Sequence, residues 1–168
     1  GMGPGPFTGL RVGIATAQGL ASALGLPARG VCTLDAIGRG IGEAGAEGER
    51  LAVQDGFRGE VFAALYGADG ARLWEPEVYR PERLGERISA LRTAPSVAGS
   101  GAVRFRGELI ESGVRIPDDA DPVHRVAARH VCALAVEAPA DGAERLSPIY
   151  LRPPDAERWR ERDSPKAE

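Results

Sequence analysis

The sequence contains few of the residues that bind metal ions or catalyse reactions. Two histidines, two cysteines and one methionine occur among 168 residues, and aromatic residues make up 5% of the chain. Cys32 and Cys132 lie far apart, which excludes the closely spaced cysteine pairs of structural zinc sites. We therefore expect both cysteines to be buried, reduced thiols in a cytoplasmic protein.

Long apolar runs and a large excess of one charge are also missing. No stretch approaches the roughly 20 apolar residues that a transmembrane helix needs, and no basic segment followed by an apolar one indicates a signal peptide. The net charge is -3, so the overall charge does not favour a nucleic acid or a membrane surface as a direct partner. A content of 43% hydrophobic and 27% charged residues is typical of a globular protein.

The two histidines do not form a helical metal-binding pair. His124 and His130 are separated by about 600° of helical rotation, whereas the two ligands of an HExxH helix share one face. We expect His130 to be a packing residue on the apolar face of a helix over 121–138 and His124 to lie in solvent. The sequence predicts no catalytic residue, no metal ligand and no cofactor.

The chain starts with a rigid loop followed by an apolar helix. The segment GPGPFTG precedes a helix predicted from Thr8, as the N-cap, to Leu24. Apolar side chains surround nearly the whole helix, and such a helix is normally buried on more than one side. A Gly-rich loop before a helix can bind phosphate, but this one lacks the Lys-Ser/Thr of a P-loop. Its prolines also remove N–H donors, so a structural turn is the favoured interpretation.

Strands and helices alternate through the middle of the chain. The predicted strands cover 28–34, 49–55, 59–67, 71–80, 95–101 and 147–152, and the predicted helices cover 35–45, 81–91 and 121–138. Strand 59–67 is apolar on both faces, as in a strand covered on both sides. Pro76 places strand 71–80 at a sheet edge. Three consecutive strands followed by helix, strand and helix predict an α/β fold of the ribonuclease-H-like type.

A candidate cleft loop joins the first two strands of the predicted meander. Asp55 ends the first strand, and Arg58 follows in the turn. In a ribonuclease-H-like lobe this loop faces the cleft, which makes both residues candidates for a functional role. The alternative is an ordinary turn in which Asp55 stabilises the backbone.

Five segments resemble, in the same order, sequence blocks of the TsaB (YeaZ) family. GPGPFTGLR resembles the family's GPGSFTGLR, and GVCTLDAIG resembles its strand followed by S-L-E-A-L. QDGFRGEVFAALY is similar to D-A-R-R-G-E-V-Y, VAGSGAVRF to the G-D-G-A segment, and SPIYLRPPDAE to the terminal P-x-Y-L-R. Pro6 stands where the family usually has Ser, and Gly56 and Phe57 replace Ala-Arg.

The resemblance implies a fold of the actin-like ATPase superfamily, with two ribonuclease-H-like lobes. Family members begin with an aspartate-bearing strand, a hairpin and a helix, which this sequence lacks before its Gly-Pro loop. We expect a truncated chain or a start assigned too late at Met2. Residues 1–26 are then a remnant helix of the N-terminal lobe, 27–154 the C-terminal lobe and 155–168 a charged flexible tail. Nucleotide binding is not expected, because the phosphate-binding loop of the superfamily lies in the missing part.

The resemblance also implies a role in the synthesis of threonylcarbamoyladenosine in tRNA. Family members are non-catalytic partners of a TsaD-type catalytic subunit, a TsaE-type ATPase joins them, and tRNA is reached only through the complex. Helices of the N-terminal lobe form this contact and the competing homodimer contact expected in isolation. The residues we expect at this interface are Leu10, Arg11, Ile14, Ala17, Gln18 and Ala21. The alternative function is that of an actin-like ATPase or glycoprotease-like peptidase acting alone.

Overall fold

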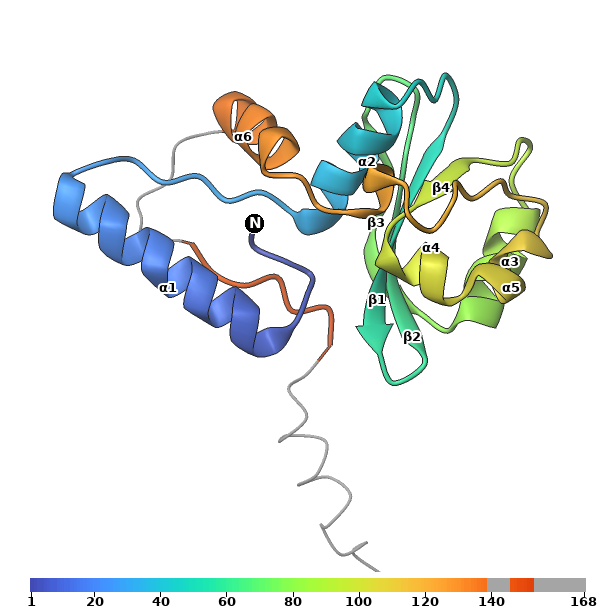
Figure 1. Cartoon of the computed structure of the whole chain (residues 1–168), viewed down its shortest axis with the longest axis horizontal. Helices are drawn as coiled ribbons and strands as arrows, with labels where there is room; N and C mark the ends of the chain where they lie inside the picture. The colour runs from blue at the N-terminus through green and yellow to red at the C-terminus, as the bar shows by residue number, and fades with distance from the viewer. Residues whose placement is uncertain (139–145, 153–168) are drawn as a thin grey trace, which may run out of the picture.

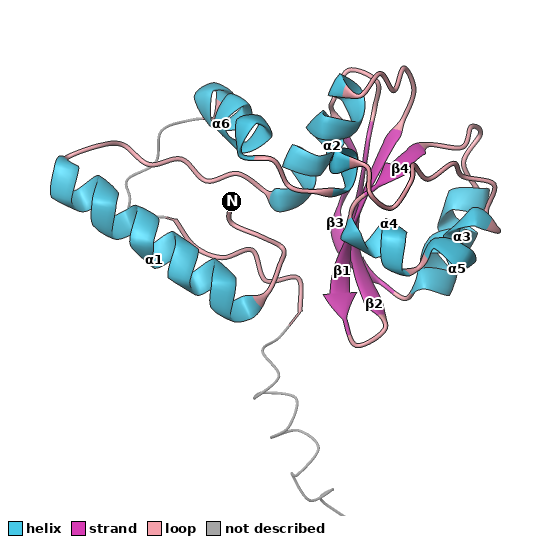
Figure 2. Ribbon diagram, viewed as in Figure 1, coloured by secondary structure: helices cyan, strands magenta, loops and turns pink. Residues whose placement is uncertain are grey.

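A four-stranded mixed sheet with helices on both faces forms the larger part of the molecule (Figure 2). The computed structural model describes residues 1–138 and 146–152. The elements, in chain order, are α1 (Phe7–Leu24), α2 (Thr33–Glu43), β1 (Arg50–Phe57), β2 (Glu60–Tyr66), β3 (Arg72–Tyr79), α3 (Pro81–Ser89), β4 (Ser96–Ala98), α4 (Ser100–Arg104), α5 (Arg106–Ile110), the 3₁₀ helix η1 (Pro122–His124) and α6 (Ala128–Glu137).

The strand order β3-β2-β1-β4 explains how the chain builds the sheet. β1, β2 and β3 form an antiparallel meander, in which Val53 of β1 lies opposite Ala63 of β2. The chain then crosses over through α3 and returns as β4, which pairs with β1 in parallel. The predicted order of three strands, helix and strand is therefore confirmed, and the sheet is mixed.

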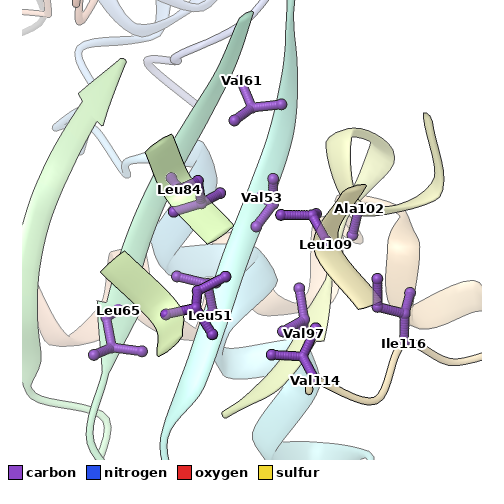
Figure 3. Packing of buried hydrophobic residues seen from close by; sticks show 12 residues of the cluster. Leu51, Val53, Val61, Leu65, Leu84, Val97, Ala102, Leu109, Val114 and Ile116 are labelled. Atoms are coloured by element: carbon purple, nitrogen blue, oxygen red, sulfur yellow. The ribbon is translucent and has the colours of Figure 1, made fainter. Parts of the chain in front are cut away.

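Both faces of the central strands are buried, as the sequence of β2 predicts. Val61, Ala63 and Leu65 belong to one hydrophobic cluster together with residues of β1, β4, α3, α4 and α5, which Figure 3 shows. Phe62 and Tyr66 belong to the cluster on the opposite face, which α2 covers. Because successive side chains of a strand point to opposite faces, one apolar run supplies both layers.

Both edges of the sheet are protected from further pairing. Pro76 lies in β3, the edge strand that the sequence predicts, and its nitrogen has no hydrogen to donate. The β2–β3 pairing also shifts register twice, between Ala63 and Tyr66. At the other edge, Ser96 of β4 forms a parallel bridge with Arg115.

Two strands that the sequence predicts are absent from the described structure. Residues 28–32 and 147–152 belong to no strand of the sheet, and residues 33 and 34 of the first predicted strand are the first residues of α2. Each segment bonds to the N-terminal loop instead. The Met2 N–H donates to the carbonyl of Val31 (2.7 Å), and the Ile149 N–H donates to the carbonyl of Met2 (2.8 Å). A ladder cannot continue along this loop, because Pro4 has no N–H.

The predicted helix over 121–138 is interrupted and becomes η1 and α6. Asp121 caps the first turn, as predicted, by accepting a hydrogen bond from the Val123 N–H (2.9 Å). His124 was expected in solvent, which is wrong: it is 6% exposed, and its Nδ1 accepts a hydrogen bond from the Gly99 N–H (3.1 Å). The hydrogen bond with Gly99 holds His124 at the end of η1. The next residue, Arg125, has extended backbone angles, so the helix does not continue.

The remaining expectations concern the two cysteines, the cap of the first helix and the C-terminal tail. Cys32 is buried, as predicted, and burial followed by the charge of Asp35 raises the pKa of its thiol. Cys132 is exposed, so its predicted burial is wrong. The expected cap at Thr8 is also wrong, because Pro6 occupies the N-cap position and no side chain caps the helix. The predicted tail over 155–168 lies outside the described residues.

We predict that His124→Ala lowers the free energy of unfolding by about 1–3 kcal/mol, because it leaves the buried N–H of Gly99 without an acceptor. Urea unfolding followed by circular dichroism measures the change. Arg125→Ala, next to it and exposed, is the matched control. A loss in His124→Ala no larger than in the control contradicts the role of His124.

Candidate partner interface

Helix α1 lies to one side of the sheet, with the segment 146–152 running alongside it (Figure 1). Its 18 residues contain one charged side chain, Arg11, and the helix ends at Gly25, which has a φ of 62°. The predicted end at Leu24 is confirmed, and the helix starts at Phe7, with its N-cap two residues before the predicted one. Among the described residues, no helix is both long and apolar enough to cross a membrane.

The inner edge of α1 is attached to the segment 146–152. The Gln18 amide donates to the carbonyl of Leu146 (3.0 Å), and Arg11 Nε donates to the hydroxyl of Tyr150 (2.9 Å). The rings of Phe7 and Tyr150 stack with centroids 5.4 Å apart, and the Arg11 guanidinium lies 3.8 Å from the Phe7 centroid. Stacked rings and a cation over a ring each add about 1 kcal/mol at such sites.

The six expected interface residues share this inner half of the helix. Ile14 and Ala21 are each 8% exposed and are covered by the chain itself. Leu10 and Gln18 are half-buried, whereas Arg11 and Ala17 are exposed. Arg11 and Ala17 therefore remain accessible to a partner, although Arg11 also donates a hydrogen bond to Tyr150. A role of all six residues in partner binding stays a prediction.

The outer half of α1 carries a long exposed face without charge. Leu20 and Leu24 are 59% and 66% exposed, and Gly9 and Gly13 share their side of the helix at spacings of four, seven and four residues. A Cβ added at Gly9 or Gly13 would meet no atom within 4 Å. We call these four residues the outer stripe.

The repeat of small residues at Gly9, Gly13 and Ala17 predicts close approach of another backbone, but sequence reasoning did not include Leu20 and Leu24 in the interface. A helix that is apolar on nearly all sides has two stripes, and the spacing alone does not decide which one the chain covers. Gly9 and Gly13, four residues apart, distinguish the outer side, because small residues let another backbone approach closely.

The candidate cleft-loop residues lie at the β1–β2 turn. The Asp55 carboxylate accepts a hydrogen bond from the Phe57 N–H (2.9 Å) and pairs with Arg104 (2.7 Å). Phe57 and Arg58 have φ values of 61° and 55°, in the left-handed region that side chains rarely adopt. Asp55 therefore stabilises a strained turn, which is the alternative that the sequence leaves open, and a cleft role for Asp55 and Arg58 stays a prediction.

Both histidines contribute to packing and lie in different surroundings. His124 contacts Gly99, as described above, and its Nε2 lies 3.3 Å from the carbonyl of Pro117. His130 is 3% exposed, packs against Gly40 of α2 and places Nδ1 3.3 Å from a carboxylate oxygen of Glu43. Within residues 1–138 and 146–152, no group of three or more metal-ligating side chains is found.

Comparison with known proteins identifies the family. Residues 1–105 match the family described as "TsaD: tRNA N6-adenosine threonylcarbamoyltransferase". The chain is 35% identical over 160 residues to the tRNA threonylcarbamoyladenosine biosynthesis protein TsaB of Escherichia coli, covering 90% of this chain and 68% of that protein. The chain belongs to the TsaB (YeaZ) family. The resemblance carried by its sequence blocks is thereby confirmed.

Other relatives show how much of a TsaB-family protein is present. An uncharacterized protein of Mycobacterium tuberculosis is 38% identical over 156 residues, covering 93% of this chain and 64% of that protein. One from Mycobacterium leprae is 48% identical over 100 residues, 60% of this chain and 25% of that protein. The chain therefore spans between a quarter and about two thirds of the length of these relatives.

Solved structures of the TsaB family share the fold. A Pseudomonas aeruginosa protein similar to peptidase YeaZ superposes with a TM-score of 0.75 at 30% identity, covering 90% of this chain and 71% of that one. YeaZ from Pseudomonas aeruginosa superposes with a TM-score of 0.72 at 28% identity, covering 90% and 72%. The mixed four-stranded sheet is thus a YeaZ-like α/β fold.

We predict that Tyr150→Ala loosens α1 from the segment 146–152, because the change removes the stacked ring and the acceptor of Arg11. A loss of about 1 kcal/mol raises amide exchange in α1 about fivefold. Hydrogen–deuterium exchange with mass spectrometry measures this rate, and Leu73→Ala on β3 is the control. Unchanged exchange in α1 would show that other contacts hold the helix.

Proposed function

We propose that this chain is a non-catalytic partner subunit in the synthesis of threonylcarbamoyladenosine in tRNA. The observation that carries the proposal is its membership of the family that contains a tRNA threonylcarbamoyladenosine biosynthesis protein, TsaB of Escherichia coli. In this proposal a TsaD-type subunit performs the catalysis, a TsaE-type ATPase joins the assembly, and tRNA is reached through the complex. We propose the same cytoplasmic location for all of them.

The chemistry of α1 supports a role in partner binding. The outer stripe presents two exposed leucines and two glycines without a charged neighbour on its face. Burying each leucine against a partner stabilises the contact by about 1.5–3 kcal/mol. The glycines allow a second backbone to approach, so the surface suits a helix that packs closely.

We propose the TsaD-type subunit as the occupant of this surface, with Ala17 at its margin. The homodimer expected in isolation uses the same side of α1 and competes with it. Binding of the subunit and self-association are therefore mutually exclusive in this proposal, and a binding measurement over a range of concentrations separates them.

The division of the chain into lobes is part of the same proposal. Residues 27–154 form a ribonuclease-H-like lobe of the actin-like ATPase type, which the order β3-β2-β1-β4 supports. Residues 1–26 supply the helix of the other lobe, and 155–168 form the tail. The hydrogen bonds of Met2 to Val31 and Ile149 tie the first segment to the second.

We predict that Leu20→Asp and Leu24→Asp each weaken binding of a purified TsaD-type subunit at least about tenfold. Each change removes about 1.5–3 kcal/mol of apolar burial, and 1.4 kcal/mol corresponds to a factor of ten. Isothermal titration calorimetry measures the affinity, and analytical ultracentrifugation of the chain alone measures self-association.

The matched control is Leu73→Asp, which introduces the same charge at a leucine that is 51% exposed on β3. Equal loss in all three variants would indicate a general effect of charge. Unchanged binding in Leu20→Asp and Leu24→Asp rejects the outer stripe as the interface. Turnover of ATP or of a peptide by the chain alone would favour the enzymatic alternative and overturn the proposed role.

We also predict that Gly13→Gln separates stability from binding. The open space around Gly13 accepts a side chain, and replacing glycine inside a helix stabilises it by up to about 1 kcal/mol. The same side chain blocks close approach of a partner, so affinity falls while the midpoint of thermal unfolding rises or is unchanged. Binding at wild-type affinity would show that no backbone approaches there.

A further inference from the structure

A polar pocket on the opposite side of the sheet from α3 and α5 has no place in the proposed function. It has a volume of about 430 Å³ and lies where α2, the β2–β3 hairpin and the last turns of α6 meet. This volume falls in the range of small-molecule sites. Its charged lining consists of the three arginines Arg39, Arg50 and Arg72 and the four carboxylates Asp35, Glu43, Asp69 and Glu137.

Most of these charges are already paired with one another. Arg72 binds both carboxylate oxygens of Asp35, at 2.9 and 2.6 Å, and Tyr66 also donates to this carboxylate (2.8 Å). Burial and the neighbouring Asp35 raise the pKa of Tyr66, so its hydroxyl stays a donor.

A second group of charges is paired across the two helices that flank the pocket. Arg39 of α2 bridges Glu43 of the same helix and Glu137 of α6, each at 3.1 Å. These pairs fix α6 beside α2 and leave their charges with little attraction for a further ligand.

One cation and one carboxylate of the lining have no ionic partner within the described residues. Arg50 donates from Nη2 to the carbonyl of Ala68 (2.6 Å), and its buried Nε has no hydrogen-bond partner. Asp69 accepts one hydrogen bond, from the Ala71 N–H (3.0 Å), which stabilises the hairpin turn. The two groups lie on the same pocket and are not within ion-pair distance of each other.

The Arg50 side chain packs against the backbone of Gly42, which has no side chain in the way. A Cβ at Gly42 of α2 would collide with the Arg50 guanidinium, so this position has to be free of a side chain for Arg50 to keep its place. Gly42 is the penultimate residue of α2, where glycine weakens a helix less than at an interior position.

We propose that this pocket binds a free α-amino acid. The planar guanidinium of Arg50 is suited to the ligand's carboxylate, and Asp69 is suited to its ammonium group. An anion without an ammonium group is disfavoured, because the charged lining of three arginines and four carboxylates is negative by one. Leu134 supplies an apolar wall for the ligand's side chain. The inference does not depend on the proposed function, since the pocket involves no residue of α1.

The test is a titration of the ¹⁵N-labelled full chain, followed by NMR, with L-leucine, L-glutamine and glycine. N-acetyl-L-leucine lacks the ammonium group, and L-leucinamide lacks the carboxylate. We expect L-leucine to cause saturable shifts of the Gly42 and Gly70 amides, and both blocked forms to bind at least about tenfold more weakly than L-leucine or not at all. No saturable shift with any of the three amino acids overturns the proposal, and so does equal binding of the blocked forms.

Three variants test the residues. Arg50→Gln removes the cation, and Asp69→Asn removes the charge while keeping an oxygen to accept the Ala71 N–H. Gly42→Ala displaces the guanidinium without changing any charge. Each should lower the affinity at least about tenfold, whereas Arg83→Gln, which breaks an exposed ion pair on α3, should not. Asp69 is exposed in a turn, so its variant keeps the fold, and undiminished affinity in Asp69→Asn overturns the assignment.

Discussion

The antiparallel pairing of β1 with β2 is the interaction on which the other layers depend. Both strands are buried on both faces, so each strand supplies side chains to two hydrophobic clusters at once. α2 packs on one cluster and α3, α4 and α5 on the other, and β4 joins the free side of β1. A slip of one residue in this register would exchange the side chains of the two faces.

The N-terminal loop connects this sheet unit to α1. Met2 bonds to Val31 on one side and to Ile149 on the other, and the Thr33 N–H donates to the carbonyl of Gly3 (2.7 Å). These bonds bring the start of α1, the start of α2 and the segment 146–152 together. The exposure of the outer stripe follows from this arrangement, because the segment covers one half of the helix.

Features that short sequence patterns determine could be predicted from the sequence. The two apolar faces of β2, the edge position that Pro76 indicates and the cap at Asp121 depend on residues close together in the chain. The break in the helix over 121–138 could not be predicted, because His124 is held by Gly99, which is distant in sequence.

The same distinction applies to the candidate interface. Spacing identifies two apolar stripes on α1, but contacts with residues 146–152 decide which stripe is covered. The pairing of Asp55 with Arg104 likewise joins elements that are separated in the chain. The sequence therefore predicted the helix correctly, but the interface residues predicted from it include Ile14 and Ala21, which the chain itself covers.

The protected edges of the sheet have a consequence for assembly. Pro76 and the register shifts on β3, together with the Ser96–Arg115 bridge beside β4, leave neither edge as a template for another strand. Edge-to-edge pairing between copies of this chain is therefore disfavoured. Association through the side-chain surface of α1 needs no free strand edge.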